Sequence, residues 1–241
     1  MILQLRSAEF SDVLEAKDSI VNYGEEAIPQ LIGLLTDKSF VKLKNTADLI
    51  YPGAEEFYGH GWIVQYDIDW ISDRSAWLLE EITFQDFGYK ILSINEDSLL
   101  KLHFQNYQSY LQTGSHKVDF EDKTSRQQFL EFRRLLADSV SRWWNKNQKT
   151  WTRFKAIKEA LSSNDEKLQH RMLQYLLFEE TACPKLTFDS YQRELKPLVE
   201  NIQRSKNSQA DLAKSLLEDK EFNWLRRKNE KNLQLTLQPL H

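Results

Sequence analysis

The sequence predicts an all-α protein with one long, partly extended insertion near residues 38–72. Apolar residues recur at helical spacing over most of the chain, which indicates amphipathic helices. Only seven glycines and five prolines occur in 241 residues, so the helices have few interruptions. One segment, residues 62–70, alternates instead with a period of two, which is typical of extended chain.

Residues 9–24 and 25–37 form the first two predicted helices. Gly24 suits the C-terminal cap of the first, because glycine adopts a positive φ without steric cost. Pro29 falls in the first turn of the second, where a missing N–H removes no helical hydrogen bond. The second helix carries apolar residues at positions i, i+3, i+4 and i+7, namely Ile28, Leu31, Ile32 and Leu35.

The stretch DRSAWLLEEITFQDFGY, residues 73–89, predicts a third amphipathic helix that ends at Gly88. Leu78, Leu79 and Ile82 form its inward stripe, and the preceding helix is its expected antiparallel partner. This pattern favours a structural building block over a chemical site.

The rest of the chain is also predicted to be mainly helical. Helices are expected over residues 97–112, 125–147, 150–162, 165–180, 187–203, 208–220 and 222–231. Pro197 should bend or split its helix, because proline lacks the N–H that the helical ladder needs.

Two segments have the period-two pattern of extended chain, residues 62–70 and the tail NLQLTLQPL, residues 232–240. In the first, Trp62, Val64, Tyr66, Ile68 and Trp70 alternate with Ile63, Gln65, Asp67 and Asp69. The pattern predicts an aromatic face that faces the helices and an exposed acidic face. Both segments are expected to lie on a helical body without forming a true sheet.

Three pieces of the sequence together resemble a HEAT-repeat unit. The stretch VLEAKDSIVNYGEEAIPQLIGLLTD is similar to the end of one repeat, a glycine turn and the first helix of the next. DRSAWLLEEITFQDFGY is similar to the second helix of that next repeat, with Asp73, Arg74 and Ala76 at positions where HEAT repeats often have an Asp/Arg pair and a small residue. SRWWNKN, further along, adds to a likeness to bacterial HEAT-repeat proteins of uncharacterised function.

The resemblance implies a right-handed solenoid of stacked antiparallel helix pairs in a single domain over residues 1–241. It covers residues 8–37 and 71–89 well and residues 124–162 loosely. Residues 163–241 carry amphipathic helices whose repeat character the sequence leaves open. Residues 38–72 form an insertion within the first full repeat, and long insertions in solenoids often lie on the binding face.

Charge is divided along the chain. Residues 48–86 hold nine acidic residues and one basic residue, whereas residues 123–158 hold ten basic and two acidic residues. One interpretation is a pair of opposed electrostatic faces, the acidic one suited to a basic partner. The other is that the two segments compensate each other within one fold.

The acidic, aromatic insertion is the predicted partner-binding site, because aromatic side chains with flanking charge are typical of protein interfaces. The candidate residues are Glu55, Glu56, Tyr58, His60, Tyr66, Asp67 and Asp69. Their carboxylates are expected to be exposed. For Trp62 and Trp70 we favour a role in anchoring the insertion to the helices.

A nucleic-acid interface is the alternative, because the basic segment also carries tryptophans, and cationic and aromatic side chains contact phosphates and bases. Its candidate residues are Arg142, Lys146, Lys149 and Arg153. Trp143 lies on the apolar stripe of its helix and is expected in the core.

Catalytic and metal sites are not predicted. The chain has no GxSxG, P-loop or GxGxxG motif. His60, Asp67 and Asp69 lack a recognised metal-ligand spacing, so no metal or cofactor is expected. A helical-repeat hydrolase or glycosylase is a less favoured alternative, since a few such scaffolds are enzymes.

The single cysteine, Cys183, excludes an internal disulfide and is typical of a reducing compartment. Without an apolar run long enough to span a membrane, the chain is expected in the cytoplasm. The most concrete functional expectation is a bacterial immunity protein, or antitoxin, that masks a basic nuclease-type toxin sterically and electrostatically. The sequence leaves the oligomeric state open.

Overall fold

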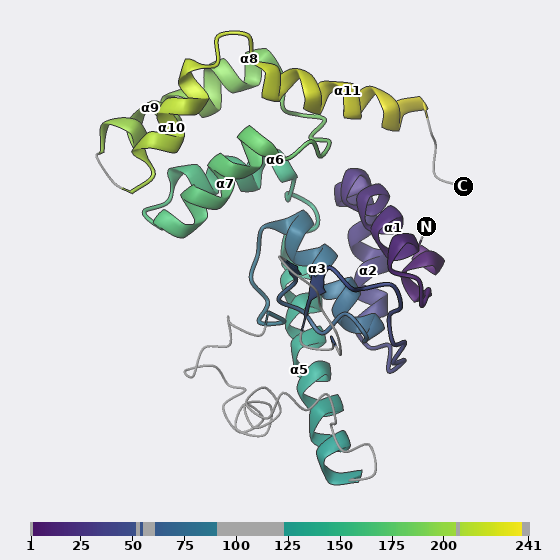
Figure 1. Cartoon of the computed structure of the whole chain (residues 1–241). Coiled ribbons are helices and arrows are strands. Elements are labelled where there is room, and N and C mark those ends of the chain that lie inside the picture. The colour runs from purple at the N-terminus through teal and green to yellow at the C-terminus, as the bar shows by residue number, and fades with distance from the viewer. Residues whose placement is uncertain (1, 52–53, 55–60, 91–122, 206–207, 238–241) are drawn as a thin grey trace. The chain divides into compact units, whose positions relative to one another are not determined.

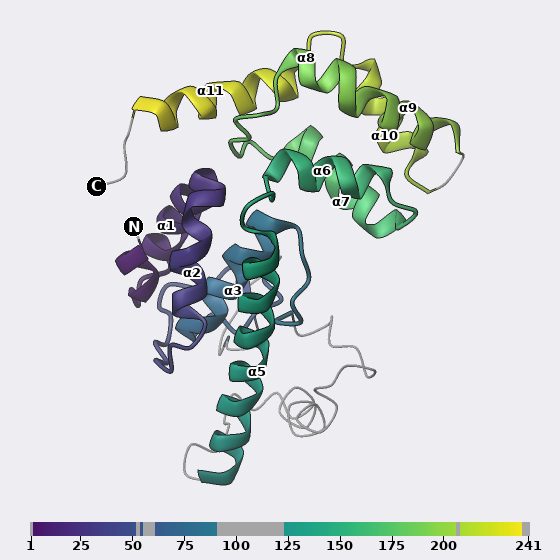
Figure 2. The same cartoon turned by 180° about the vertical axis from the view of Figure 1, so that it is seen from behind.

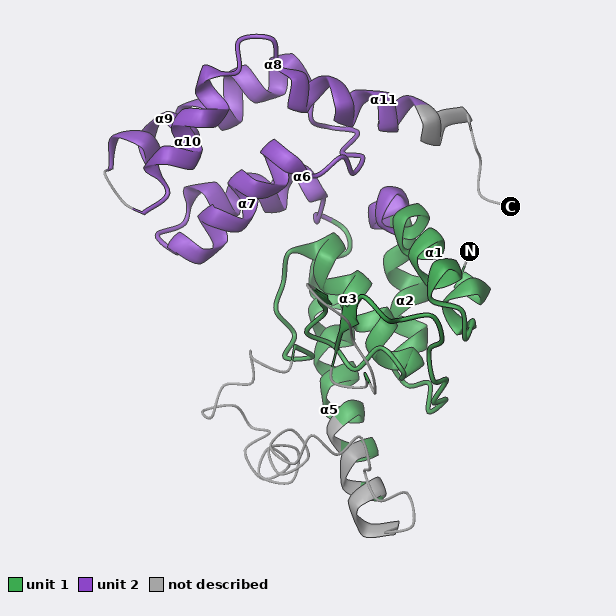
Figure 3. Ribbon diagram, viewed as in Figure 1, with its two compact units in different colours: residues 1–20, 26–149 green, residues 21–25, 150–241 purple. Residues whose placement is uncertain are grey.

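The computed structural model is mostly helical and describes residues 2–51, 54, 61–90, 123–205 and 208–237 (Figure 1). The chain divides into two compact units (Figure 3). Unit 1 comprises Met1–Ile20 and Glu26–Lys149, and unit 2 comprises Val21–Glu25 and Thr150–His241. The helix predicted over residues 97–112 lies outside the described residues, and the single-domain, repeat-based organisation stays a prediction.

Unit 1 contains both short strands and the N-terminal helices. Its elements are η1 (Ile2–Arg6), α1 (Phe10–Tyr23, whose last turn belongs to unit 2), α2 (Ile28–Leu34), β1 (Leu49–Ile50), β2 (Trp62–Ile63), α3 (Ile71–Thr83) and α5 (Lys123–Asn147). The 3-10 turn η2 (Gly24–Ala27) joins α1 to α2. Among the described helices, none has the length and apolar content needed to cross a membrane.

The boundaries of the first two helices follow the sequence closely. Gly24 has φ +60° directly after α1, which confirms its predicted role at the end of that helix. The proline of α2 lies in the first turn, also as predicted. α2 packs against α3, and the Ser75 hydroxyl donates a hydrogen bond of 2.6 Å to the Leu31 carbonyl.

Helix α3 is the centre of unit 1, because every one of its residues except Glu81 is buried. α2 covers one side, and α5 lies beside it in both views (Figures 1 and 2). Further contacts come from the N-terminal segment, from Lys17 of α1 and from residues 38–70. The amphipathic pattern of residues 73–89 therefore does not mark a solvent-facing side.

The predicted end of this helix at Gly88 is wrong. α3 ends at Thr83, and Phe84 follows in the left-handed region at φ 59°. The Glu80 carboxylate accepts hydrogen bonds from the backbone N–H groups of Phe87 (2.7 Å) and Tyr89 (3.4 Å). These bonds hold the chain in a turn where a helix would need the same N–H groups for its own carbonyls.

The insertion is extended only over a short part of its described length. β1 and β2 pair in parallel, with Leu49 opposite Trp62 and Ile50 opposite Ile63. A side chain at Gly61 would clash with Ile50, at 2.6 Å from its Cγ1, so the two strands require glycine there. The predicted alternation over residues 62–70 holds only over residues 63–66, because both residues of β2 are exposed and residues 66–70 are all buried.

Unit 2 consists of helices and turns in its described part. Its elements are α6 (Arg153–Ser162), α7 (Glu166–Phe178), α8 (Phe188–Ser190), the π-helical turn η3 (Tyr191–Leu195), α9 (Lys196–Arg204), α10 (Ala210–Glu218) and α11 (Asn223–Leu237). α6 packs on α7 and α9 on α10, and α10 and α11 both contact α7.

The predicted interruption at Pro197 is confirmed as a change in helical type. The N–H of Lys196 bonds to the Tyr191 carbonyl, five residues back, which makes the π-helical turn η3. Proline in the next position has no N–H to continue an α-helical ladder. The α-helix resumes as α9, with the proline in its first turn.

The predicted extended tail is also wrong in its first part. α11 continues to Leu237, so residues 232–237 are helical. The first half of α11 is anchored by the buried Trp224, Leu225 and Lys228. The alternating leucines follow this anchored part and continue the same helix.

Candidate binding pocket

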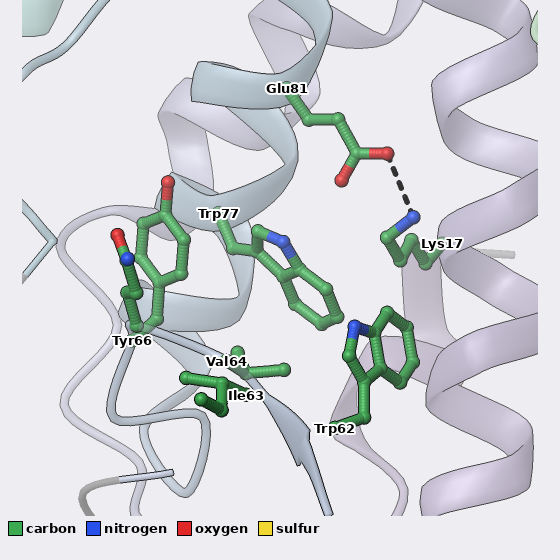
Figure 4. A pocket seen from close by; sticks show the side chains of 8 residues that line it. Lys17, Trp62, Ile63, Val64, Tyr66, Trp77 and Glu81 are labelled. Atoms are coloured by element: carbon green, nitrogen blue, oxygen red, sulfur yellow. Dashed lines mark hydrogen bonds and ion pairs between the residues drawn. The ribbon is translucent and has the colours of Figure 1, made fainter. Parts of the chain in front are cut away.

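An aromatic pocket of about 260 Å³ opens on the surface of unit 1 (Figure 4). It is formed where β2 and the residues after it approach α1 and α3. Its lining residues are Lys17, Trp62, Ile63, Val64, Gln65, Tyr66, Trp77 and Glu81. Pockets for small-molecule ligands usually measure roughly 300–1,000 Å³, so this one has the size for the end of a single long side chain.

Three aromatic rings form the walls. The Trp62 and Trp77 rings meet at 67° with centroids 6.5 Å apart, and the Tyr66 ring stacks on Trp77 at 6.2 Å and 29°. Trp77 and Tyr66 are buried, whereas Trp62 is 52% exposed and its neighbour Ile63 is 66% exposed. Anchoring was the favoured role for Trp62, yet over half of its surface remains available to a partner.

An ion pair closes one side of the pocket. The Lys17 ammonium on α1 lies 2.8 Å from Glu81 Oε1 on α3 and 5.3 Å from the centroid of the Trp77 ring (Figure 4). The two side chains are only 12% and 23% exposed. The pocket therefore combines aromatic surface with one ammonium and one carboxylate, and these two charges balance.

The Tyr66 ring is held in place from behind. Its hydroxyl donates a hydrogen bond of 2.6 Å to Glu80 Oε2, and both residues are buried. Burial raises the pKa of the Glu80 carboxyl, and the hydrogen bonds from Tyr66 and Phe87 oppose that rise. Tyr66, a predicted site residue, thus contributes a fixed wall to the pocket.

The carboxylates predicted to be exposed, Asp67 and Asp69, are buried, at 2% and 0% exposure. Asp69 accepts hydrogen bonds from the Leu43 N–H (2.9 Å) and the Tyr51 hydroxyl (3.0 Å), and the Lys42 ammonium lies 3.2 Å away. These donors make the carboxylate part of the folded insertion. A surface role for Asp67 and Asp69 is therefore corrected to an internal one.

The other predicted partner-binding residues, Glu55, Glu56, Tyr58 and His60, lie outside the described residues. Trp70 is buried and stacks edge-on against Phe40 at 5.3 Å, which agrees with its predicted anchoring role.

Arg74 fastens the insertion and the N-terminal segment to α3. Its guanidinium is fully buried and donates hydrogen bonds to four backbone carbonyls. The acceptors are Ile68 (2.5 Å), Leu5 (2.6 Å), Ser7 (2.7 Å) and Val41 (2.7 Å). Burial lowers the pKa of Arg74 to about 10, so the side chain stays charged at neutral pH.

Asp73 forms a two-pronged ion pair with Arg133 of α5. Arg133 Nη1 lies 2.5 Å from Asp73 Oδ1, and Nη2 bonds the other carboxylate oxygen. Burial raises the pKa of Asp73 to about 7, the Arg133 charge opposes the rise, and nearby Asp67 adds to it. This pair joins the acidic and the basic sequence segments, as the interpretation of internal charge compensation expects.

Of the four candidate nucleic-acid residues, three are exposed and one, Arg153, is buried. Arg142, Lys146 and Lys149 are exposed at and beyond the end of α5, in unit 1. Arg153 belongs to unit 2 and is 3% exposed. Its guanidinium donates to the carbonyls of Ala182 (2.5 Å) and Val21 (2.6 Å), so its assignment to a basic surface is wrong.

The described residues offer little for catalysis. They contain no group of three or more His, Cys, Asp or Glu side chains arranged to hold a metal ion. Cys183 is buried, and burial raises the pKa of its thiol to about 11, which disfavours the nucleophilic thiolate. Of the residues that line the pocket, Glu81 is the one carboxylate, and Lys17 neutralises it.

Sequence reasoning missed the pocket itself, because its parts come from distant positions. Lys17 and Glu81 are separated by 64 positions, and both lie within regular helical patterns. Trp77 was the available signal, since a tryptophan beside an inward stripe of leucines can border a surface opening.

Comparisons of the chain with family models, with curated proteins and with solved structures gave no match. The likeness to HEAT repeats therefore stays a resemblance, and the mostly helical fold is what the structure itself supports.

Proposed function

We propose that this chain is a non-catalytic protein-binding scaffold that engages its partner at the aromatic pocket of unit 1. The supporting observation is the pair Trp62 and Ile63, which are 52% and 66% exposed beside a pocket of about 260 Å³. Tryptophan is enriched among residues that dominate binding energy at interfaces. Trp62 stands on β2, whose pairing with β1 fixes its position before a partner arrives.

The buried hydrogen bonds behind the pocket support the same proposal. Arg74 holds the insertion against α3, and Asp69 binds Leu43 within the insertion, so the pocket wall is a preformed surface. A preformed surface loses little conformational entropy on binding. In the fullest version of the proposal the scaffold is built of HEAT-like helix pairs, for which the α6–α7 and α9–α10 pairs of unit 2 are candidates.

The most concrete role is that of an immunity protein or antitoxin, which covers the active site of a basic, nuclease-type toxin. Asp67 and Asp69 cannot supply contacts to such a partner without unfolding the insertion. The exposed acidic groups within the insertion, such as Asp48, and the Glu81 carboxylate in the pocket are the groups left to meet its positive charge.

Affinity purification from the source organism, followed by binding measurements with the purified partner, tests this function. We expect Trp62→Ala to weaken binding by at least tenfold, since interface tryptophans commonly contribute ~2 kcal/mol or more. Leu3→Ala is the matched control, because Leu3 is 80% exposed in the same unit but does not line the pocket. Equal affinity of the wild type and Trp62→Ala for the partner would show that the pocket is not the interface.

For the immunity role, the same variants are added to the partner's nuclease assay. Wild type and Leu3→Ala should suppress the nuclease, and Trp62→Ala should require at least tenfold more protein for the same suppression. A partner without nuclease activity would remove this role while leaving the binding function.

A second candidate is nucleic-acid binding by α5. Arg142 and Lys146 are exposed at i and i+4, which places them on one side of α5, and the exposed Lys149 follows in the turn after the helix. Three phosphate contacts predict that log K falls with log salt at a slope of about −2.7 on duplex DNA. Gel shifts at several salt concentrations measure the slope, which the triple change to glutamine should abolish. Arg134→Gln serves as control, because Arg134 is exposed on the same helix but paired with Glu131.

A further inference from the structure

The aromatic pocket already holds a cation of its own chain. The Lys17 ammonium lies against the Trp77 ring, at 5.3 Å from its centroid, and within 2.8 Å of the Glu81 carboxylate. An aromatic ring face with an adjacent carboxylate is the chemistry that recognises ammonium and guanidinium groups. The position of Lys17 therefore indicates that the part of the pocket beside Trp77 and Glu81 stabilises an ammonium group.

The pocket extends beyond the space that Lys17 occupies. The Trp62 ring stands at 67° to the Trp77 ring, and Trp62 is 52% exposed. Tyr66 and Val64 complete an apolar wall that suits the methylene chain of a long basic side chain. The exposed Trp62 thus leaves this side of the pocket open to an incoming side chain.

The Lys17 side chain is held in the pocket by the ion pair of its ammonium with Glu81. Among the described residues Glu81 is the hydrogen-bond acceptor found for its ammonium, which has three N–H donors. Its long flexible side chain can turn outward into water from the body of α1. If another cation takes its place, the charge of the pocket is unchanged, so the exchange needs no new countercharge.

We propose that the pocket binds the ammonium or guanidinium end of a basic side chain from the partner, which replaces the Lys17 ammonium at Glu81 and Trp77. Lys17 then acts as a resident competitor that lowers affinity for isolated cations. This inference rests on the proposed binding function and specifies the group that the pocket recognises. It fits a basic partner, since Glu81 and the ring faces complement positive charge.

Two small probes separate cation recognition from apolar binding. Nα-acetyl-lysine methylamide and Nα-acetyl-norleucine methylamide share a straight four-carbon chain and differ by the ammonium group. Each is titrated into the full chain, and binding is followed by the indole N–H resonance of Trp62, assigned with Trp62→Phe. The lysine derivative should shift this resonance, and the norleucine derivative should bind at least threefold more weakly.

Variants of the ion pair test the exchange. Lys17→Met should tighten binding of the lysine derivative by roughly 3- to 10-fold, and Glu81→Gln should weaken it by a similar factor. Lys44→Met is the matched control, because Lys44 is an exposed lysine of the same unit that does not line the pocket. Equal binding of the two derivatives, or unchanged affinity in Lys17→Met, would overturn the proposal.

These outcomes are independent of the partner experiment. A protein partner that needs Trp62 while neither ion-pair variant changes lysine binding would refute cation recognition and leave the binding function intact. Selective lysine binding that tightens in Lys17→Met, without any protein partner, would support the site and refute the proposed function.

Discussion

The replacement of Arg74 by lysine tests how much of unit 1 depends on a single side chain. Arg74 donates to four backbone carbonyls at 2.5–2.7 Å from three nitrogen atoms, and the bonds to Ile68 and Leu5 are buried. A lysine keeps the positive charge but has three N–H donors on one nitrogen. At least one carbonyl must lose its donor, and the compact ammonium cannot span the spread of the other three.

A hydrogen bond to a charged group contributes ~1.5–3 kcal/mol, and a buried carbonyl left without a donor costs about 1–3 kcal/mol. We therefore expect Arg74→Lys to lower the free energy of unfolding by ~2–5 kcal/mol, a large part of the 5–15 kcal/mol typical of a domain. Urea unfolding followed by tryptophan fluorescence and circular dichroism measures the change. Limited proteolysis should in addition cut within residues 38–51 faster than in the wild type.

Arg142→Lys is the control, since Arg142 is exposed on α5 and the same exchange there should change stability by less than ~0.5 kcal/mol. If Arg74→Lys is as stable as Arg142→Lys, the four carbonyls are not fastened by the guanidinium and the role given to Arg74 is refuted.

Three further changes have defined outcomes. In Gly61→Ala the new Cβ would lie 2.6 Å from Ile50. The change should therefore destabilise the β1–β2 pair by more than ~1 kcal/mol and broaden the Trp62 indole resonance. A wild-type spectrum would contradict the close approach. Asp73→Leu and Arg133→Met should each cost ~3–5 kcal/mol in chemical unfolding, whereas the double variant should cost less than either, since it leaves no buried charge unpaired; additive losses would argue against the pair. Burial lowers the pKa of Lys228 to about 7 in the folded protein. Between pH 7 and 10 the unfolded chain therefore binds more protons than the folded chain. The free energy of unfolding of unit 2 should rise by more than ~1 kcal/mol over this range of pH. Lys228→Met should flatten that rise in unfolding measured at several pH values, and an unchanged slope would exclude this lysine as its source.

Local patterns predicted the helices well where the deciding contacts are local. Gly24 and Pro29 act within their own turns, and both positions match the structure. Pro197 acts on the turn that precedes it, and the predicted interruption is present as a π-helical turn.

The errors occur where a distant group overrides the local pattern. Asp69 is buried because its carboxylate receives donors from Leu43 and Tyr51, 26 and 18 positions away. No local period reports such donors, so a carboxylate in an alternating segment is read as exposed. The same reason explains Arg153, whose acceptors at Val21 and Ala182 are 132 and 29 positions distant.

The candidate pocket was predictable in part. The sequence pointed to the insertion, and Trp62 and Tyr66 do line the pocket. The other lining residues, Lys17, Trp77 and Glu81, come from helices whose packing with the insertion depends on the tertiary fold. A sequence can therefore indicate the segment that carries a site before it indicates the residues that face it.

The position of Arg74 also has a consequence for the order in which unit 1 is made. Two of its acceptors, the carbonyls of Leu5 and Ser7, precede it by 69 and 67 positions. Its neighbour Asp73 meets its partner 60 positions later, at Arg133. Because synthesis proceeds from the N-terminus, the early segments have no buried donor until residue 74 has left the ribosome, and α3 has no complete set of charges until α5 follows. Unit 1 thus closes late in translation, and a nascent chain stopped before residue 74 holds the insertion without the side chain that fastens it.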